Sequence, residues 1–351
     1  MGRDGGVDVL IVSLGSTAGL RRADEELQLS MEKAGASVSL ARAVAPVEVR
    51  TLMLTDLSWA HAARAAARRT LARLGGAPPR AIVYSSTTSA LLWPRAGAIR
   101  FDAPSAGNRP GRHGLWQRPL ERVRLRRAPL LLPWSEGALG ELPVELRAGD
   151  RALVLPVAVE PSAGTRAVQA GSGSGRDLAA ITYAANPSKK GLDRVLAAWR
   201  QVRAGRPPGE ELVVVGASPQ ELEGAGCSPA GQEGVRILGA LPQAEYRALL
   251  RRARVFVCAP RREDYGLAQL EALADGCQLV TTPAPGPYAA LPLARTLDSR
   301  LVGEDLAGAL RTALEDPIAE YASRALAALA PFRREPLDRV VAEQLLPRLL
   351  A

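Results

Sequence analysis

Two glutamates with seven residues between them, Glu263 and Glu271, mark the densest group of chemically capable side chains. An apolar run ends at Cys258 before them, and Gly266 lies between them, where a helix is expected to begin. The first N–H groups of a helix lack internal partners, so those of Gly266 and Leu267 can bind a diphosphate, and a glycine lets it approach closely. Glu271, one turn into the helix, can accept bonds from ribose hydroxyls, and Glu263 can reach a sugar.

A pair of neighbouring lysines, Lys189 and Lys190, precedes another glycine, Gly191. The chain has only three lysines among its 45 basic residues. Two of them side by side in an arginine-rich chain indicate a specific role rather than a solvated helix end. Their charge suits a diphosphate.

These residues together resemble the signature of the retaining glycosyltransferases of family 4, also described as glycosyl transferases group 1. The stretch from Glu263 to Glu271 contains the family's aromatic-Gly-Leu sequence, beginning at Tyr265, and Lys190 begins its Lys-Gly-hydrophobic-Asp element. The segments ending at Gly216 and containing Ile237 resemble two further loop-forming strands of the donor site. The resemblance covers Leu178 to about Thr282, with all four elements in order.

This resemblance implies a GT-B fold, in which two doubly wound Rossmann-like domains face each other across a cleft. It implies transfer of a sugar from a nucleoside diphosphate sugar to an acceptor, with retention of configuration, without metal and without another cofactor. Lys190 would stabilise the departing diphosphate, Glu271 would hold the ribose, and Glu263 would orient the sugar. The family places an arginine where this chain has Ala185 and Asn186. Either Asn186 substitutes as a neutral donor, or Lys189 provides the missing charge.

In the N-terminal half the resemblance is looser. Gly15 lies at the turn after the first apolar run, where the family has a loop facing donor and acceptor. Asp102 follows the fourth expected strand, with Phe101 in the place of the family's histidine. A position at the carboxyl end of a strand favours a contact to sugar or acceptor. His113 can enter the cleft from the next loop, or it can be an ordinary exposed histidine.

A basic segment, residues 109–127, contains seven arginines and one glutamate among apolar residues. Residues 1–165 hold 22 basic against 15 acidic residues, within a net charge of +9. Such a segment can lie on an anionic membrane or bind a phosphate-bearing or lipid-linked acceptor. A solvated helix face, or a genomic preference for arginine, explains the same pattern. Nucleic-acid binding is disfavoured, because stacking aromatics and a recognised binding fold are missing.

The surrounding sequence alternates short apolar runs with helical patterns, as parallel α/β sheets require. Expected strands include Val38–Ala41, Ile99–Asp102, Pro129–Leu132, Ala152–Leu155 and Gln278–Thr281, and Asp56 is expected to cap a long helix. The predicted domains are 1–165, a Ser- and Gly-rich linker at 166–177, a donor domain at 178–333 and a helix at 334–351 that crosses back to the first domain.

No apolar run approaches the ~18 residues of a spanning helix, and the first residues lead into a strand rather than a signal peptide. Cys227, Cys258 and Cys277 are read as buried thiols of a reducing compartment. The expected location is cytoplasmic, with peripheral association at the inner membrane face. Two other classes stay open: an inactive nucleotide-binding or scaffold relic of the same fold, and a basic membrane- or polyanion-binding protein.

Overall fold

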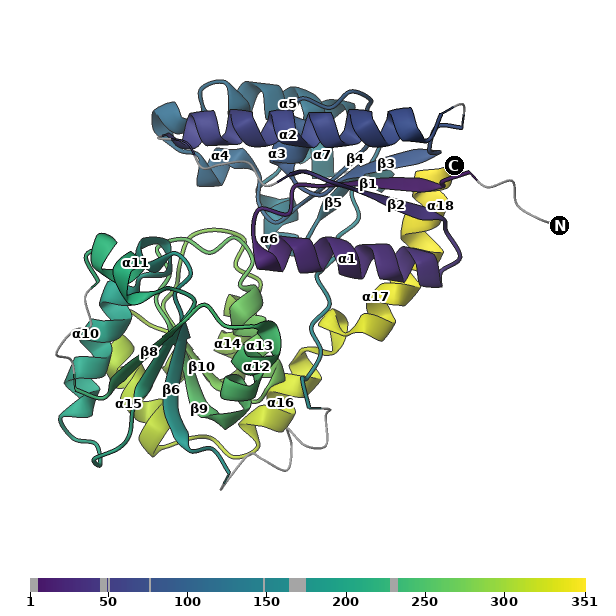
Figure 1. Ribbon diagram of the computed structural model, residues 1–351. Coiled ribbons are helices and arrows are strands. Elements are labelled where there is room, and N and C mark those ends of the chain that lie inside the picture. Colours follow the sequence, from purple (N-terminus) through teal and green to yellow (C-terminus); the bar gives the residue numbers. More distant parts are fainter. Residues whose placement is uncertain are drawn as a thin grey trace. The chain divides into compact units, whose positions relative to one another are not determined.

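The computed structural model describes residues 6–44, 49, 51–75, 77–147, 149–163, 175–227 and 233–351 (Figure 1). Most of the expected linker, residues 166–174, lies outside this part of the chain. Contacts divide the chain into two units. The first comprises Met1–Ala158 with Arg334–Ala351, and the second comprises Val159–Arg333.

The first unit is built on a five-stranded parallel sheet in the order β2-β1-β3-β4-β5. Its central strands are short apolar runs buried on both faces, which is the pattern that parallel sheets require. The strands are β1 Val9–Ser13, β2 Val38–Arg42, β3 Ala81–Tyr84, β4 Ala98–Phe101 and β5 Leu131–Pro133.

Helices cover both faces of this sheet. Side chains of α1, including Leu27 and Met31, pack with Val341 and Leu345 of the C-terminal helical segment against one face, while α2 and α5 cover the other. The helical elements are α1 Ala18–Lys33, α2 Leu52–Arg73, α3 Thr87–Ala90, α4 Ser105–Asn108, η1 Gly111–Gly114, α5 Gln117–Arg127, α6 Glu136–Gly140, α7 Val144–Arg147, η2 Gly149–Arg151, α17 Arg334–Val340, the π-helical turn Val341–Leu345 and α18 Leu346–Leu350.

Two local expectations are wrong in this unit. Asp56 does not cap α2, because the helix begins at Leu52 with Thr51 as its cap. Asp56 lies within the helix and forms an ion pair with Arg109. Ala152–Leu155 is not a strand: Ala152 forms an isolated bridge to Leu131, and the N–H of Leu155 donates to the carbonyl of Pro133 at 2.8 Å. A parallel ladder cannot continue there, since Pro133 has no N–H to donate.

The second unit repeats the architecture with the order β10-β9-β6-β7-β8, all parallel. Helices α10 and α15 cover one face and α12 and α13 the other (Figure 1). Its elements are β6 Leu178–Tyr183, α9 Pro187–Lys190, α10 Leu192–Arg203, β7 Leu212–Val215, α11 Pro219–Gly224, β8 Val235–Gly239, α12 Gln243–Arg252, β9 Ala253–Cys258, α13 Leu267–Ala274, β10 Gln278–Thr281, α14 Ala290–Leu297, η3 Ser299–Leu301, α15 Leu306–Glu315, α16 Tyr321–Ala328 and η4 Ala330–Phe332.

Strand order in this second sheet reverses between β6 and β9. Loops at the carboxyl ends of these two neighbouring strands leave in opposite directions, which opens the crevice where doubly wound sheets bind their ligands. The lysine pair follows β6, and Glu263 follows β9. The topology therefore brings the two sequence motifs to one place.

The three cysteines are buried and free, as expected. No helix in the described ranges has the length and apolar content to cross a bilayer.

Candidate donor site

The loops after β6 and β9 are joined by their backbones. The N–H of Arg261 donates to the carbonyl of Lys189 at 2.9 Å. Gly191 then turns the chain from α9 into α10 with a φ of 63°, and a Cβ at this position would lie 1.9 Å from the carbonyl oxygen of Ala259. Only glycine allows this approach, which explains why the Lys-Gly motif has a glycine after the lysine.

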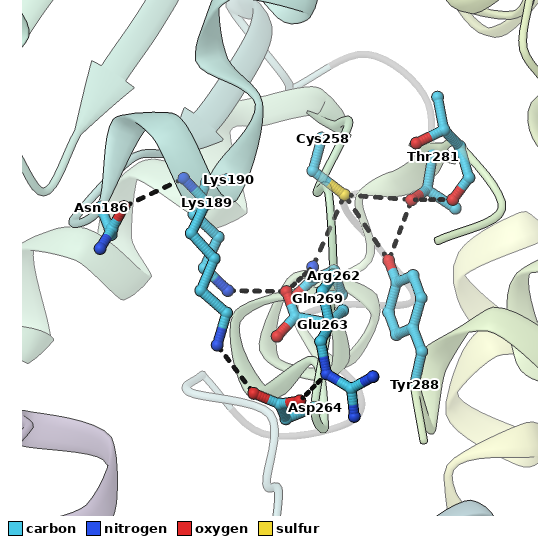
Figure 2. A network of polar contacts seen from close by, with 11 residues as sticks. Asn186, Lys189, Lys190, Cys258, Arg262, Glu263, Asp264, Gln269, Thr281 and Tyr288 are labelled. Carbon is cyan, nitrogen blue, oxygen red and sulfur yellow. Dashed lines mark hydrogen bonds and ion pairs between the residues drawn. The ribbon is translucent and has the colours of Figure 1, made fainter. Parts of the chain in front are cut away.

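Lys190 and Glu263 form an ion pair across the switch point. Lys190 Nζ lies 2.6 Å from Glu263 Oε2, and both side chains are largely buried (Figure 2). An ammonium group has three N–H donors. Within the described residues, only one of them has a protein partner. The lysine can thus hold the acid and still bind an anion.

A second lysine–acid pair lies beside the first. Lys189 Nζ is 2.7 Å from Asp264 Oδ2, and Arg262 Nε is 2.7 Å from the other carboxylate oxygen (Figure 2). Burial alone would raise the pKa of Asp264, yet the two cations outweigh burial and hold the pKa below its usual range. Asp264 was not predicted, although its place next to Glu263 on the same loop was a usable signal.

Helix α13 begins at Gly266 without a side-chain cap. Gly266 has a φ of 91°, and a Cβ there would meet the Tyr288 ring at 2.7 Å. Its neighbour Tyr265 is buried and Leu267 is half-buried. A bare helix start of this kind leaves backbone N–H groups for an anion.

Glu271 is buried in α13, and groups from α12 hold it. Its Oε1 accepts a bond from Gln243 Nε2 at 2.8 Å and lies 3.7 Å from Arg247 Nη1. Arg247 also pairs with Asp275 at 2.5 Å. Burial, and after it the Glu271 charge, raises the pKa of Tyr183. Gln243 and Arg247 were not predicted, although their spacing of four residues places them on one helix face.

The remaining predicted donor contacts have distinct places. The side-chain oxygen of Asn186 caps α9 by accepting from Lys189 N at 3.0 Å. Gly216 follows β7 with a φ of 103°, and a Cβ there would lie 2.9 Å from Ala185 N. Ile237 is half-buried within edge strand β8, opposite Val214.

Three of the predicted site residues, Gly15, Asp102 and His113, lie in the first unit. Gly15 has a φ of 57° directly after β1, and its carbonyl accepts a bond from Arg21. Asp102 follows β4 and accepts from the N–H of Ala103 at 2.9 Å. His113 is exposed in η1. These three residues thus belong to the first unit, whereas the lysines and Glu263 belong to the second.

The sequence of the second unit matches a known family. Residues 178–316 fit the family model described as glycosyl transferases group 1. They form a group 1 glycosyltransferase domain. The matched residues include both lysines, both glutamates and the bare helix start, so the resemblance found in the sequence is confirmed at the level of group 1. No curated protein matches the chain.

Solved structures extend the likeness beyond the matched domain. WaaG, a glycosyltransferase involved in lipopolysaccharide biosynthesis, is similar with a TM-score of 0.67 and 14% identity, over 95% of this chain and 99% of that one. HepE from Anabaena, solved with UDP-glucose, has a TM-score of 0.67 and 15% identity, over 96% and 98%. Sucrose-phosphate synthase from Thermosynechococcus elongatus has a TM-score of 0.63 and 17% identity, over 94% and 96%. The expected GT-B fold class is confirmed.

Proposed function

We propose that this protein transfers a glycosyl group from a nucleoside diphosphate sugar to an acceptor, through the group 1 domain. The observation that carries the proposal is the 2.6 Å contact between Lys190 and Glu263 across the switch point of the second sheet. It places a cation with unused N–H groups beside an acid, at the point where such sheets bind nucleotides.

Charge separation between an oxocarbenium-like sugar and a departing diphosphate is the main barrier of this reaction. Lys190 and the N–H groups at the start of α13 are fixed by the fold before the charge develops. Preorganised donors of this kind contribute about 3 to 4 kcal/mol each when they are buried. In this scheme Glu271 anchors the ribose, and Glu263 orients the sugar.

We propose retention of the anomeric configuration, on the strength of the family 4 signature. We also propose that no metal takes part, because Lys190 and the N–H groups at the start of α13 offer the diphosphate the donors of the metal-free scheme. HepE was solved with UDP-glucose, which supports a nucleotide-sugar donor here. The closer assignment to family 4 rests on the motif alone.

A ligand screen tests the donor assignment. Thermal-shift measurements with UDP, GDP, ADP and TDP, then with their sugars, should identify one stabilising nucleotide. Slow hydrolysis of the matching sugar donor should follow, because water can replace the acceptor. Nucleotide binding without hydrolysis of any donor would favour the inactive relic, and no binding by any of the four would refute the donor site.

A second proposal concerns the acceptor side. We propose that residues 109–127 contact an anionic membrane surface, where a lipid-linked or other phosphate-bearing acceptor would be presented. The side chain of Leu115 is 63% exposed and that of Val123 is 40% exposed. Arg122 and Arg126 are exposed along the same helix, α5. Exposed apolar groups beside arginines suit an anionic leaflet. This would place a cytoplasmic enzyme at the inner face of the membrane.

A further inference from the structure

Gln269 is a buried polar side chain. It lies on α13 between Ala268 and Leu270, and it is only 1% exposed. Burying an amide is costly unless its hydrogen bonds are replaced. Among the described residues, its Oε1 has no partner. The contacts of the amide are therefore made through its Nε2 donor.

That donor connects Glu263 to a buried network. Gln269 Nε2 donates to Glu263 Oε2 at 3.0 Å and lies 3.6 Å from Cys258 Sγ (Figure 2). The Cys258 thiol in turn lies 3.3 Å from Thr281 Oγ1. Tyr288 closes the network, with its hydroxyl 3.0 Å from Thr281 Oγ1. These side chains come from β9, β10 and the loop after β10, so the network connects the Gln269 amide to two strands of the sheet.

The contacts to Glu263 are one-sided. Lys190 and Gln269 both donate to Oε2, and within the described residues no donor reaches Oε1. The backbone of Glu263 is held as well, because its N–H donates to the carbonyl of Pro285 at 3.1 Å. With the backbone and one carboxylate oxygen fixed, the direction of the other oxygen is determined.

We infer that Gln269 is a positioning residue: it holds Glu263 so that Oε1 is presented to a hydroxyl of the donor sugar. This inference rests on the proposed function. Gln269 touches neither nucleotide nor sugar and acts through Glu263. Its removal should therefore impair recognition of the sugar and leave recognition of the nucleoside diphosphate unchanged.

The test compares the affinity of the full chain for two ligands by calorimetry. The ligands are the nucleoside diphosphate that stabilises the protein most among UDP, GDP, ADP and TDP, and the tightest-binding sugar of that nucleotide. Gln269→Met retains the volume and loses the amide. It should weaken the nucleotide sugar about tenfold, as expected for loss of a hydrogen bond to a charged group. The free diphosphate should bind within a factor of two of wild type.

A matched control is Gln278→Met. Gln278 is also buried, with an unpartnered Oε1, but its amide donates to the carbonyl of Ala313 at 2.8 Å. This variant should bind both ligands like wild type. Should Gln269→Met fail to fold, Gln269→Glu preserves the shape and sets a carboxylate against Glu263, and it should weaken the nucleotide sugar at least as much.

A double variant separates positioning from general damage. In the Glu263→Gln background, Gln269→Met should cause no further loss of nucleotide-sugar affinity, because the residue through which it acts has already been changed. Equal weakening of both ligands, the same effect in Gln278→Met, or additive losses in the double variant would each overturn the inference. Wild-type protein that binds neither ligand would instead refute the proposed function and the inference with it.

Discussion

Gly191 and Ala259 are in backbone contact, and this contact sets the spacing between the two halves of the donor site. No side chain can be accommodated at position 191, since its Cβ would lie 1.9 Å from the Ala259 carbonyl oxygen. The lysines precede Gly191 directly, and Glu263 comes four residues after Ala259. The distance between their charged groups therefore depends on this close approach.

We expect Gly191→Ala to separate the two loops. Its left-handed backbone and the clash act together, so the loss of unfolding free energy should exceed the ~1 kcal/mol typical of alanine at a positive φ. Gly209→Ala is the matched control, because Gly209 has a φ of 94° but open space around its Cβ position. Urea unfolding of both variants measures the difference. Equal losses would show that the contact does not constrain the loops.

Glu271→Gln should weaken binding of the nucleoside diphosphate. A charge-assisted bond to a ribose hydroxyl is worth about 1.5 to 3 kcal/mol, which corresponds to about 10- to 150-fold in affinity. Calorimetric titration of the variant checks this value. The control is Glu245→Gln, on the exposed side of α12, which should leave affinity unchanged. Unaltered affinity in the Glu271 variant would count against its contact with the nucleotide.

Removal of divalent metal should leave glycosyl transfer intact. Lys190, which uses one N–H group for Glu263 among the described residues, and the uncapped start of α13 already offer donors at the proposed diphosphate position. Donor turnover after dialysis against EDTA, compared with turnover after adding Mg²⁺ or Mn²⁺, tests this expectation. Loss of activity in EDTA that either metal restores would refute the metal-free scheme.

The stability of the first unit should depend on pH through Asp24. Burial raises the pKa of this carboxyl to about 6, against the opposing effects of Arg100 and a bond from Ser13. A raised pKa means that the folded state prefers the protonated acid. The stabilisation is complete below the unfolded value of 3.8 and is lost as the pH rises through about 6.

Comparison with Asp24→Asn isolates this contribution, because the other titrating groups are common to both proteins. From pH 4 to pH 7, the unfolding free energy of wild type should fall relative to that of the variant by about 2 kcal/mol. Urea unfolding at several pH values provides the measurement. A difference that stays constant across this range would exclude Asp24 as the titrating group.

Membrane contact should depend on α5 and the turn before it. The triple variant Leu115→Ser, Arg122→Ser and Arg126→Ser removes one exposed apolar group and two exposed charges. It should reduce co-sedimentation with vesicles containing phosphatidylglycerol by tenfold or more, since each basic residue near an anionic surface is worth about 1 kcal/mol. Purely phosphatidylcholine vesicles serve as the control surface. Equal binding of wild type and variant would refute the surface.

Several features of this protein could be predicted from local sequence alone. Apolar runs such as Gln278–Thr281 gave correct strands, and the bare helix start at Gly266 follows from a glycine before an apolar helix. The error at Asp56 arose because aspartate is a common helix cap, whereas Thr51 was already present five residues earlier. Asp56 instead lies within the helix and pairs with Arg109, 53 residues away.

The sequence by itself determined the residue types of the donor site: two lysines before a glycine, two acids and a glycine at a helix start. Only the tertiary structure decided their partners, because strand order, rather than chain order, brings β6 beside β9. The pairing of Lys190 with Glu263 and of Lys189 with Asp264 follows from that reversal. Hydrogen bonds between residues more than 70 positions apart produce no local sequence pattern. A helix start does produce one, because the residues that form it are neighbours in the chain.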